Sequence, residues 1–84
     1  MGQAIMHNLK TIPPYFEQVR FGIKTFELRK DDREFCVDDL LHLMEYKDNA
    51  FTGEAVTVEI THILRDAPQF GLMPGYCIIS FKKI

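Results

Sequence analysis

The sequence predicts a small α+β domain, in which a sheet of five to six short strands curls toward a barrel and one short helix follows the first strand. The chain has 84 residues, enough for a single domain with one modest core. Hydrophobic residues make up 46% of it and charged residues 26%, close to average globular usage. Short apolar or alternating segments recur between turn residues, and a curled sheet hides the edges of such short strands best.

Five segments have the length and side-chain pattern of strands. In one of them, residues 25–30, Phe26 and Leu28 alternate with polar side chains, which indicates a strand with one buried face. The last segment, residues 76–81, is expected to close the sheet. The expected strands are residues 6–12, 25–30, 40–46, 57–64 and 76–81.

The fourth expected strand, residues 57–64, follows a hairpin connection in residues 47–53. Strict alternation places Ile60 and Leu64 on one face of this strand and Ile63 on the other. We therefore expect the side chains of Ile60 and Leu64 to lie on the same face of the sheet and the side chain of Ile63 to lie on the opposite face.

One helix is expected, over residues 13–21. The two prolines that open it suit a first helical turn, where the missing N–H is not needed. Phe16 and Val19 lie three residues apart and would share its buried face. Gly22 is placed to end it.

The formal net charge is −2, which argues against a protein that coats a long polyanion. The charge is unevenly distributed, however. Residues 1–30 hold five basic and two acidic side chains, residues 31–66 hold three basic and ten acidic ones, and two lysines follow. If the two chain ends meet in space, they would form a positive face. The basic residues expected on it are Lys10, Lys24, Arg29 and Lys82.

The sequence indicates an intracellular protein without a membrane segment. Residues 1–10 lack an uninterrupted apolar run, so we expect no secretory signal. No segment approaches the roughly 20 apolar residues that a membrane span needs. The two cysteines, Cys36 and Cys77, are expected as small buried side chains and not as a disulfide framework. We therefore expect a cytoplasmic location.

The densest charged segment is residues 24–34, in which eight of eleven side chains are charged, four of each sign. On a strand, Glu27 and Arg29 point to the same face, and Lys24 lies at the start of that strand, after the turn at Gly22. Mixed charge runs usually form a solvated face with weak ion pairs. By itself, the segment is therefore more typical of a surface than of a site.

The segment G-I-K-T-F-E-L-R, residues 22–29, resembles the G-x-K-x-x-E-x-R signature of the ASCH domains, a branch of the PUA-like superfamily. The similarity extends over about residues 6–82 and includes the closing loop and strand of a compact bacterial and phage branch. Asp38 stands where relatives often carry a turn glycine, and aspartate tolerates the left-handed conformation better than most residues. The flanking segments that match are His7–Lys10, Pro14–Phe16, Asp31–Arg33, Val37–Asp39, Phe70–Leu72 and Pro74–Tyr76.

This resemblance implies a PUA-like pseudo-barrel with a cleft that binds RNA, another single-stranded nucleic acid or a nucleotide. Arg29 would donate two hydrogen bonds to a phosphate or a guanine edge, and Lys24 would supply a point charge. Glu27 would accept a hydrogen bond from an exocyclic amine. Tyr15 or Tyr76 would stack on a base. The residues that it implies for the site are Lys24, Glu27 and Arg29 in the cleft, Lys30 and Arg33 on its rim, and Lys10, Tyr15 and Tyr76.

Two other functions stay open. Some members of the superfamily are amidohydrolases that act on acylated cytidines, with the signature lysine and a threonine three residues later. Lys24 matches that lysine, but Glu27 occupies the position of the threonine. The other alternative is a protein-interaction module, in which residues 58–64 or 76–81 form an open edge that pairs with a second copy into a homodimer.

No metal and no cofactor are expected. His7, His42 and His62 lie on three different expected strands, without a pair at metal-ligand spacing. His42 and His62 fall in apolar runs, which is typical of hydrogen-bonded core histidines. The sequence also has no glycine-rich phosphate loop.

Overall fold

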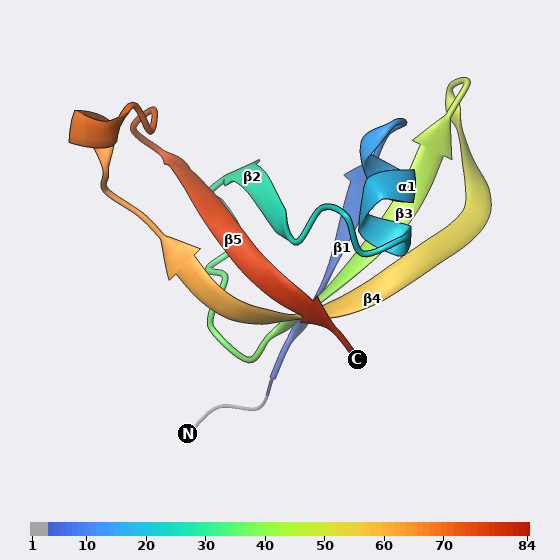
Figure 1. Ribbon diagram of the computed structural model, residues 1–84, viewed down its shortest axis with the longest axis horizontal. Coiled ribbons are helices and arrows are strands. Elements are labelled where there is room, and N and C mark those ends of the chain that lie inside the picture. Colours follow the sequence, from blue (N-terminus) through green and yellow to red (C-terminus); the bar gives the residue numbers. More distant parts are fainter. Residues whose placement is uncertain (1–3) are drawn as a thin grey trace.

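A computed structural model describes residues 4–84, in which five strands form one bent sheet with a single α-helix (Figure 1). The small α+β fold and its curled sheet are therefore confirmed. Residues 1–3, which belong to the segment in which no secretory signal is expected, lie outside the described residues. The elements are β1 (Met6–Thr11), α1 (Tyr15–Arg20), β2 (Phe26–Lys30), β3 (Leu40–Lys47), β4 (Ala50–Leu64), the short 3₁₀ helix η1 (Pro68–Phe70) and β5 (Tyr76–Lys83).

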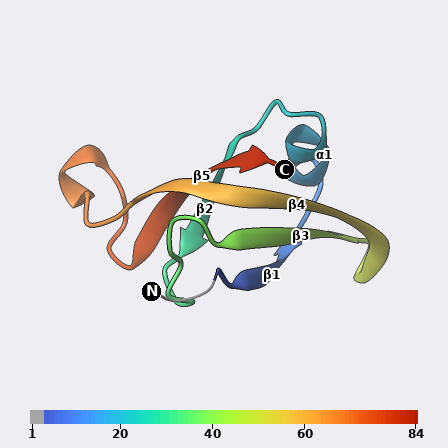
Figure 2. The same ribbon diagram turned by 90° about the horizontal axis from the view of Figure 1, so that it is seen from below.

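The strand order in the sheet is β1-β3-β4-β5-β2. β1 runs parallel to β3, and the other neighbouring strands are antiparallel. Figures 1 and 2 show that the long strand β4 curves from one half of the sheet into the other, so the sheet forms an open half-barrel. β1 and β2 are its two edges. Within residues 4–84, no helix is long and apolar enough to cross a membrane.

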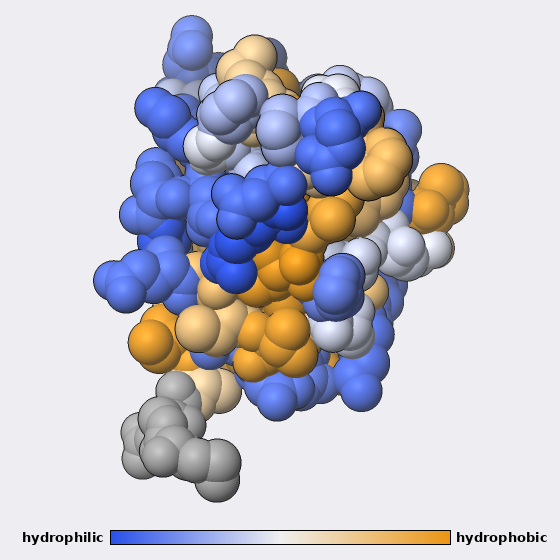
Figure 3. Space-filling view, turned by 90° about the vertical axis from the view of Figure 1, so that its left-hand side faces the viewer, coloured by the Kyte–Doolittle hydropathy of each residue, from blue (hydrophilic) through white to orange (hydrophobic). Residues whose placement is uncertain are grey.

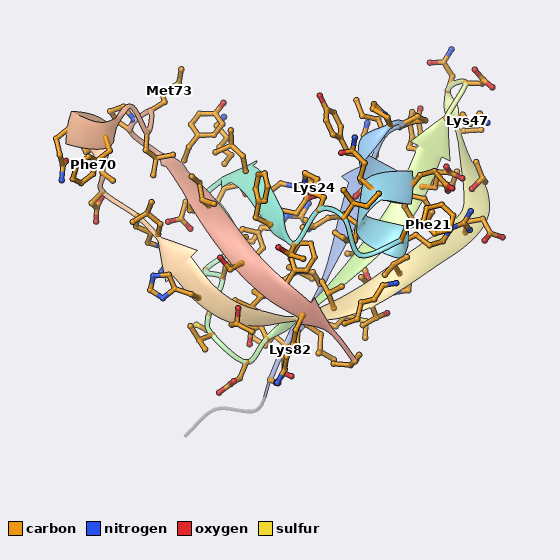
Figure 4. All side chains as sticks on the ribbon, viewed as in Figure 1. Phe21, Lys24, Lys47, Phe70, Met73 and Lys82 are labelled. Atoms are coloured by element: carbon orange, nitrogen blue, oxygen red, sulfur yellow. The ribbon has the colours of Figure 1, made fainter. Side chains whose placement is uncertain are left out.

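The expected open edge at residues 76–81 is wrong, and within residues 4–84 the segment 58–64 lacks a backbone partner on one side only beyond Ile60. β5 lies between β4 and β2. From Val58 to Leu64, β4 pairs with β5 on one side. On its other side, β4 pairs with β3 and then with the backbone of residues 38–39, and this pairing ends at Ile60. The terminal strands β1 and β5 are not neighbours, so Lys82 does not join the expected positive face, whereas Lys10, Lys24 and Arg29 do lie together. Lys82 lies 3.7 Å from Glu59 and, in Figure 4, points away from the hollow side that holds Lys24.

The hydrophobic core receives buried side chains from α1 and from every strand except β2. Phe16 and Val19 of the helix are both buried, as expected. Phe35, in the loop between β2 and β3, fills a further core position, which leaves Cys36 beside it exposed. Cys77 is buried in the core, and burial raises the pKa of its thiol. The expected burial is thus confirmed for Cys77 and wrong for Cys36.

A β-bulge reverses the faces of the last residues of β4. The pairing of β4 with β5 shifts its register between Ile60 and His62, so Thr61 is an extra residue in the strand. Beyond this point Ile63 packs against the core, while Leu64 is exposed. The expected alternation is therefore wrong after Ile60, and His62 is an exposed residue instead of a core histidine.

Candidate functional site

A cleft of about 520 Å³ opens between the edge strands β1 and β2, next to the first residue of α1. Figure 4 shows Lys24 on this hollow side of the molecule, between β2 and α1. The segments that line the cleft are far apart in sequence and meet because the sheet bends. Of the eight site residues predicted from the sequence, five line this cleft: Lys10, Tyr15, Lys24, Glu27 and Arg29.

Glu27 is the buried residue of β2, with only 4% of its surface exposed. It pairs in register with Ile79 of β5 and therefore faces the interior of the half-barrel. The apolar residues Phe26 and Leu28 are 47% and 57% exposed. The predicted half-buried strand is confirmed, but the buried face is the charged one and not the apolar one.

Two basic side chains make the burial of Glu27 possible. Lys24 Nζ lies 2.6 Å from Glu27 Oε1, and Arg29 Nε lies 2.9 Å from Glu27 Oε2. A buried carboxylate is strongly unfavourable unless it is paired and hydrogen-bonded. Because two cations surround one anion, the floor of the cleft keeps an excess of positive charge.

The end of α1 directs Lys24 into the cleft. Gly22 has a φ of +77°, and its N–H donates to the carbonyl of Val19 at 3.0 Å. The N–H of Ile23 donates to the carbonyl of Gln18 at 2.8 Å, which completes a Schellman motif. The N–H of Lys24 donates to the same carbonyl at 2.9 Å. The turn predicted at Gly22 is confirmed, and it fixes the backbone from which the Lys24 side chain extends.

Arginine side chains from β2 and from the loop that follows it reach the edge strand β1. Arg29 Nη2 donates to the carbonyl of Lys10 at 2.8 Å and lies 3.4 Å from Thr11 Oγ1. Arg33 Nη1 donates to the carbonyl of Asn8 at 2.9 Å. Both carbonyls belong to the edge of β1 that faces away from β3, where unpaired backbone groups would invite another strand. The two guanidinium groups therefore close the gap that the half-barrel leaves open.

The cleft has aromatic side chains beside its ammonium group. Lys24 Nζ lies 4.9 Å from the ring centre of Phe26 and 5.6 Å from that of Tyr15. Each of these two residues is 47% exposed, so much of the ring surface remains accessible. Cation–π contacts help to hold the ammonium group, and open ring faces are suited to a planar ligand. Phe26 is not among the predicted site residues, because alternation in its strand does not show that its ring lies beside the ammonium group.

The other three predicted site residues lie outside this cleft. Lys30 and Arg33 line a smaller hollow of about 140 Å³, and Arg29 borders both spaces. Tyr76 lines a third hollow of about 350 Å³ near Met73. Figure 4 shows Met73 and Phe70 at one end of the molecule. Figure 3 looks onto that end and shows an apolar patch bordered by hydrophilic side chains.

Thr11 is a second residue of the cleft that the sequence did not single out. It is 3% exposed and ends β1, and its hydroxyl faces the Arg29 guanidinium. It therefore places a hydroxyl in the same cleft as Lys24 and Glu27. Only the bend of the sheet brings Thr11 near this segment, so no sequence spacing could have indicated it.

The histidines and carboxylates of residues 4–84 do not form a group that could hold a metal ion. His42 is half-buried and hydrogen-bonded to Thr57, with Nδ1 and Oγ1 3.0 Å apart. His7 is buried, and its Nε2 lies 2.9 Å from Asp39 Oδ2. Burial raises the pKa of Asp39, but hydrogen bonds from His7 and from two backbone N–H groups outweigh it and hold the pKa below its ordinary value. This pair is a structural anchor at the start of β1.

The fold and site thus define a small α+β domain whose edge strands enclose a cationic, partly aromatic cleft. The chain belongs to the family described as domain of unknown function (DUF3850), whose model matches residues 6–81. It is also similar to an uncharacterized 12.9 kDa protein in the GpA 3′ region of Escherichia phage P2, with 38% identity over 60 residues. The match covers 71% of this chain and 55% of the phage protein, so the chain spans about half the length of that relative.

Proposed function

We propose that this protein is a PUA-like domain of the ASCH type that binds RNA or a nucleotide in the cleft between β1 and β2. The observation that carries the proposal is the floor of the cleft, where Lys24 and Arg29 surround the buried Glu27 beside two exposed aromatic rings. The curled five-stranded sheet with its early helix and the signature in residues 22–29 support the assignment.

The floor of the cleft has donors left for a ligand. Lys24 Nζ can donate three hydrogen bonds. It donates one to the carbonyl of Phe26 at 2.7 Å and one to Glu27, so, among the described residues, one N–H is left. Arg29 uses Nε and Nη2, and within residues 4–84 its Nη1 has no hydrogen-bond partner. These free N–H groups suit the acceptors of a base edge or a phosphate. Because both Glu27 oxygens are already bound, Glu27 acts here by orienting the two cations.

The size and charge of the cleft favour a ligand that makes a small, local contact with the protein. Its volume of about 520 Å³ lies in the range of pockets that hold one small molecule. Aromatic rings beside a positive group are the usual means of holding an unpaired base. The net charge of −2 disfavours extended coating of a polyanion but leaves such a local site possible.

Binding of short single-stranded RNAs, measured by fluorescence anisotropy at low and moderate salt, tests this proposal. Tyr15→Leu removes a ring and leaves the ion pairs of Glu27 in place, and Lys24→Met removes a charge. We expect each variant to weaken binding by about tenfold, the value of one stacked base or one charged hydrogen bond. Lys82→Met, on the other side of the sheet, is the matched control and should bind like wild type. Equal binding by all four proteins, or no binding by wild type at either salt concentration, contradicts the proposal.

One observation favours amidohydrolysis of an acylated cytidine as a second candidate. The Thr11 hydroxyl lies in the same cleft as Lys24, although no threonine follows Lys24 at the spacing of the hydrolase pattern. Incubation with N4-acetylcytidine should then release cytidine, and Lys24→Met and Thr11→Val should each stop the reaction. Absence of turnover by the folded wild-type protein removes this candidate for that substrate.

A further inference from the structure

We infer that the small hollow on the other side of Arg29 binds a phosphate group, so that the ligand is a nucleoside phosphate with its base in the cleft. This inference rests on the proposed function and names the ligand class. The cleft and the hollow share the Arg29 side chain as their common wall. A single ligand with two ends can therefore occupy both spaces at once.

The two spaces differ in the side chains that they offer. Tyr15, Phe26 and Leu28 give the cleft an aromatic and apolar wall. The hollow is smaller, about 140 Å³, and half of its lining residues are basic. A planar base fits the first environment, and a compact anion fits the second. The residues that line the hollow are Leu9, Arg29, Lys30, Asp32, Arg33 and Phe35.

The two guanidinium groups of the hollow are held in place before any ligand binds. Arg29 is fixed by the carbonyl of Lys10, and Arg33 is fixed by the carbonyl of Asn8. Because these acceptors are two residues apart on one strand, they are separated by about 6.6 Å. The two guanidinium groups are thus held along the same stretch of β1, where one phosphate can bridge them through charge-assisted hydrogen bonds. Most of the entropic cost of ordering these side chains is already met in the free protein.

Donors remain on each of the basic side chains. Arg33 uses Nη1 for the carbonyl of Asn8, and within the described residues its Nε and Nη2 have no hydrogen-bond partner. The same holds for Nη1 of Arg29. Lys30 is exposed, and none of the ion pairs among residues 4–84 includes it. The guanidinium groups supply the planar donor geometry that suits phosphate oxygens, and Lys30 adds a mobile point charge.

Asp32 is the one acidic side chain of the hollow, and its charge opposes that of a phosphate. The neighbouring carboxylate, Asp31, is already paired with Arg65 at 2.5 Å. Arg29 is already paired with Glu27, and the two other basic side chains of the hollow, Lys30 and Arg33, against Asp32 leave it positive. Asp32 therefore limits the affinity for phosphate without abolishing it, and its replacement by asparagine should strengthen binding.

Calorimetric titration of the whole protein with nucleosides, their 5′- and 3′-monophosphates and dinucleotides tests the inference. We expect wild type to bind a monophosphate or a dinucleotide about tenfold more tightly than the matching nucleoside, the value of one or two charged hydrogen bonds. A preference for the monophosphate indicates a terminal phosphate, and a preference for the dinucleotide indicates a phosphodiester. Arg33→Gln should reduce this ratio toward one without changing nucleoside affinity, and Asp32→Asn should increase it. Lys82→Gln is the control and should keep the wild-type ratio.

The outcomes separate the inference from the proposed function. If nucleosides bind but the phosphate adds nothing, or if Arg33→Gln keeps the wild-type ratio, the phosphate site is wrong and the cleft proposal stands. If wild type binds neither nucleosides, monophosphates nor dinucleotides, both are wrong. Arg33 is exposed, and urea denaturation of each variant confirms that the comparison is between folded proteins.

Discussion

Arg29 of β2 donates a hydrogen bond to the backbone carbonyl of Lys10 in β1 across 2.8 Å, although these strands are the opposite edges of the sheet. The same guanidinium binds Glu27 through Nε at 2.9 Å. A single side chain thus pairs a buried carboxylate and closes the half-barrel. The walls of the cleft and the stability of the fold are therefore linked through Arg29.

Replacement of Arg29 by methionine should destabilise the protein. The variant keeps the apolar stem but removes one of the two cations of Glu27 and the contact with Lys10. We expect the free energy of unfolding to fall by about 2–3 kcal/mol, measured by urea denaturation. Arg33→Gln, which removes one exposed hydrogen bond to Asn8, should cost less than about 1 kcal/mol. Equal losses in the two variants would show that Arg29 has no special role in closing the sheet.

The burial of Glu27 predicts a large effect for a change that is usually mild on a surface. Glu27→Gln removes the charge that pairs with Lys24 and Arg29, and we expect it to lower the free energy of unfolding by about 2–4 kcal/mol. Glu17 of α1 also pairs with a residue three positions away, Arg20, but on the exposed surface. Glu17→Gln is therefore the matched control, and its urea midpoint should stay within the error of the measurement. A similar small effect at Glu27 would contradict its burial.

The β-bulge in β4 predicts which of two adjacent apolar residues contributes to the core. Ile63→Ala should lower the free energy of unfolding by about 1–2 kcal/mol, because the Ile63 side chain packs against the core. Leu64→Ala should change it by less than about 0.5 kcal/mol, because Leu64 is 40% exposed. Strict alternation from Ile60 predicts the opposite order, so thermal or urea unfolding of the two variants decides between the two arrangements.

The anchor between His7 and Asp39 predicts a loss of stability in acid. Since the folded state holds the pKa of Asp39 below its unfolded value of about 3.9, ionised Asp39 stabilises the fold above that value, and this stabilisation is lost as the pH falls through the folded-state pKa. Asp39→Asn should be about 1–3 kcal/mol less stable than wild type at pH 7. The difference should shrink below about pH 4, measured by urea denaturation at a series of pH values. A difference that stays constant down to about pH 2 would contradict this sign.

Local patterns predicted the strands, the helix and its end, because these depend on residues close in sequence. The helix buries Phe16 and Val19 as its spacing indicates, and Gly22 ends it with a positive φ. Asp38 has a φ of +78°, which confirms the left-handed turn predicted there. The turn that starts β4 at residue 50 is formed by residues 48–49, both with positive φ, whereas the sequence placed the start of this strand at residue 57.

The orientation of the strands could not be predicted, because it depends on pairings between distant segments. Alternation in β2 shows two faces but does not say which is buried, and the ion pairs of Glu27 decide in favour of the charged face. The bulge at Thr61 likewise follows from the pairing with β5. Five predicted site residues meet in one cleft, but the division at Arg29 that places Arg33 in a separate hollow is visible only in three dimensions.

Mapping of backbone amide shifts on the ¹⁵N-labelled protein during titration with a short single-stranded RNA tests the proposed cleft most directly. The largest shifts are predicted at the amides that surround the cleft, those of Thr11, Tyr15, Lys24, Glu27 and Arg29. Residues around Lys82 and Glu59 on the other side of the sheet should change little. Saturable shifts confined to the cleft would support binding there. Shifts centred on Lys82, or none at a large excess of RNA, would contradict it.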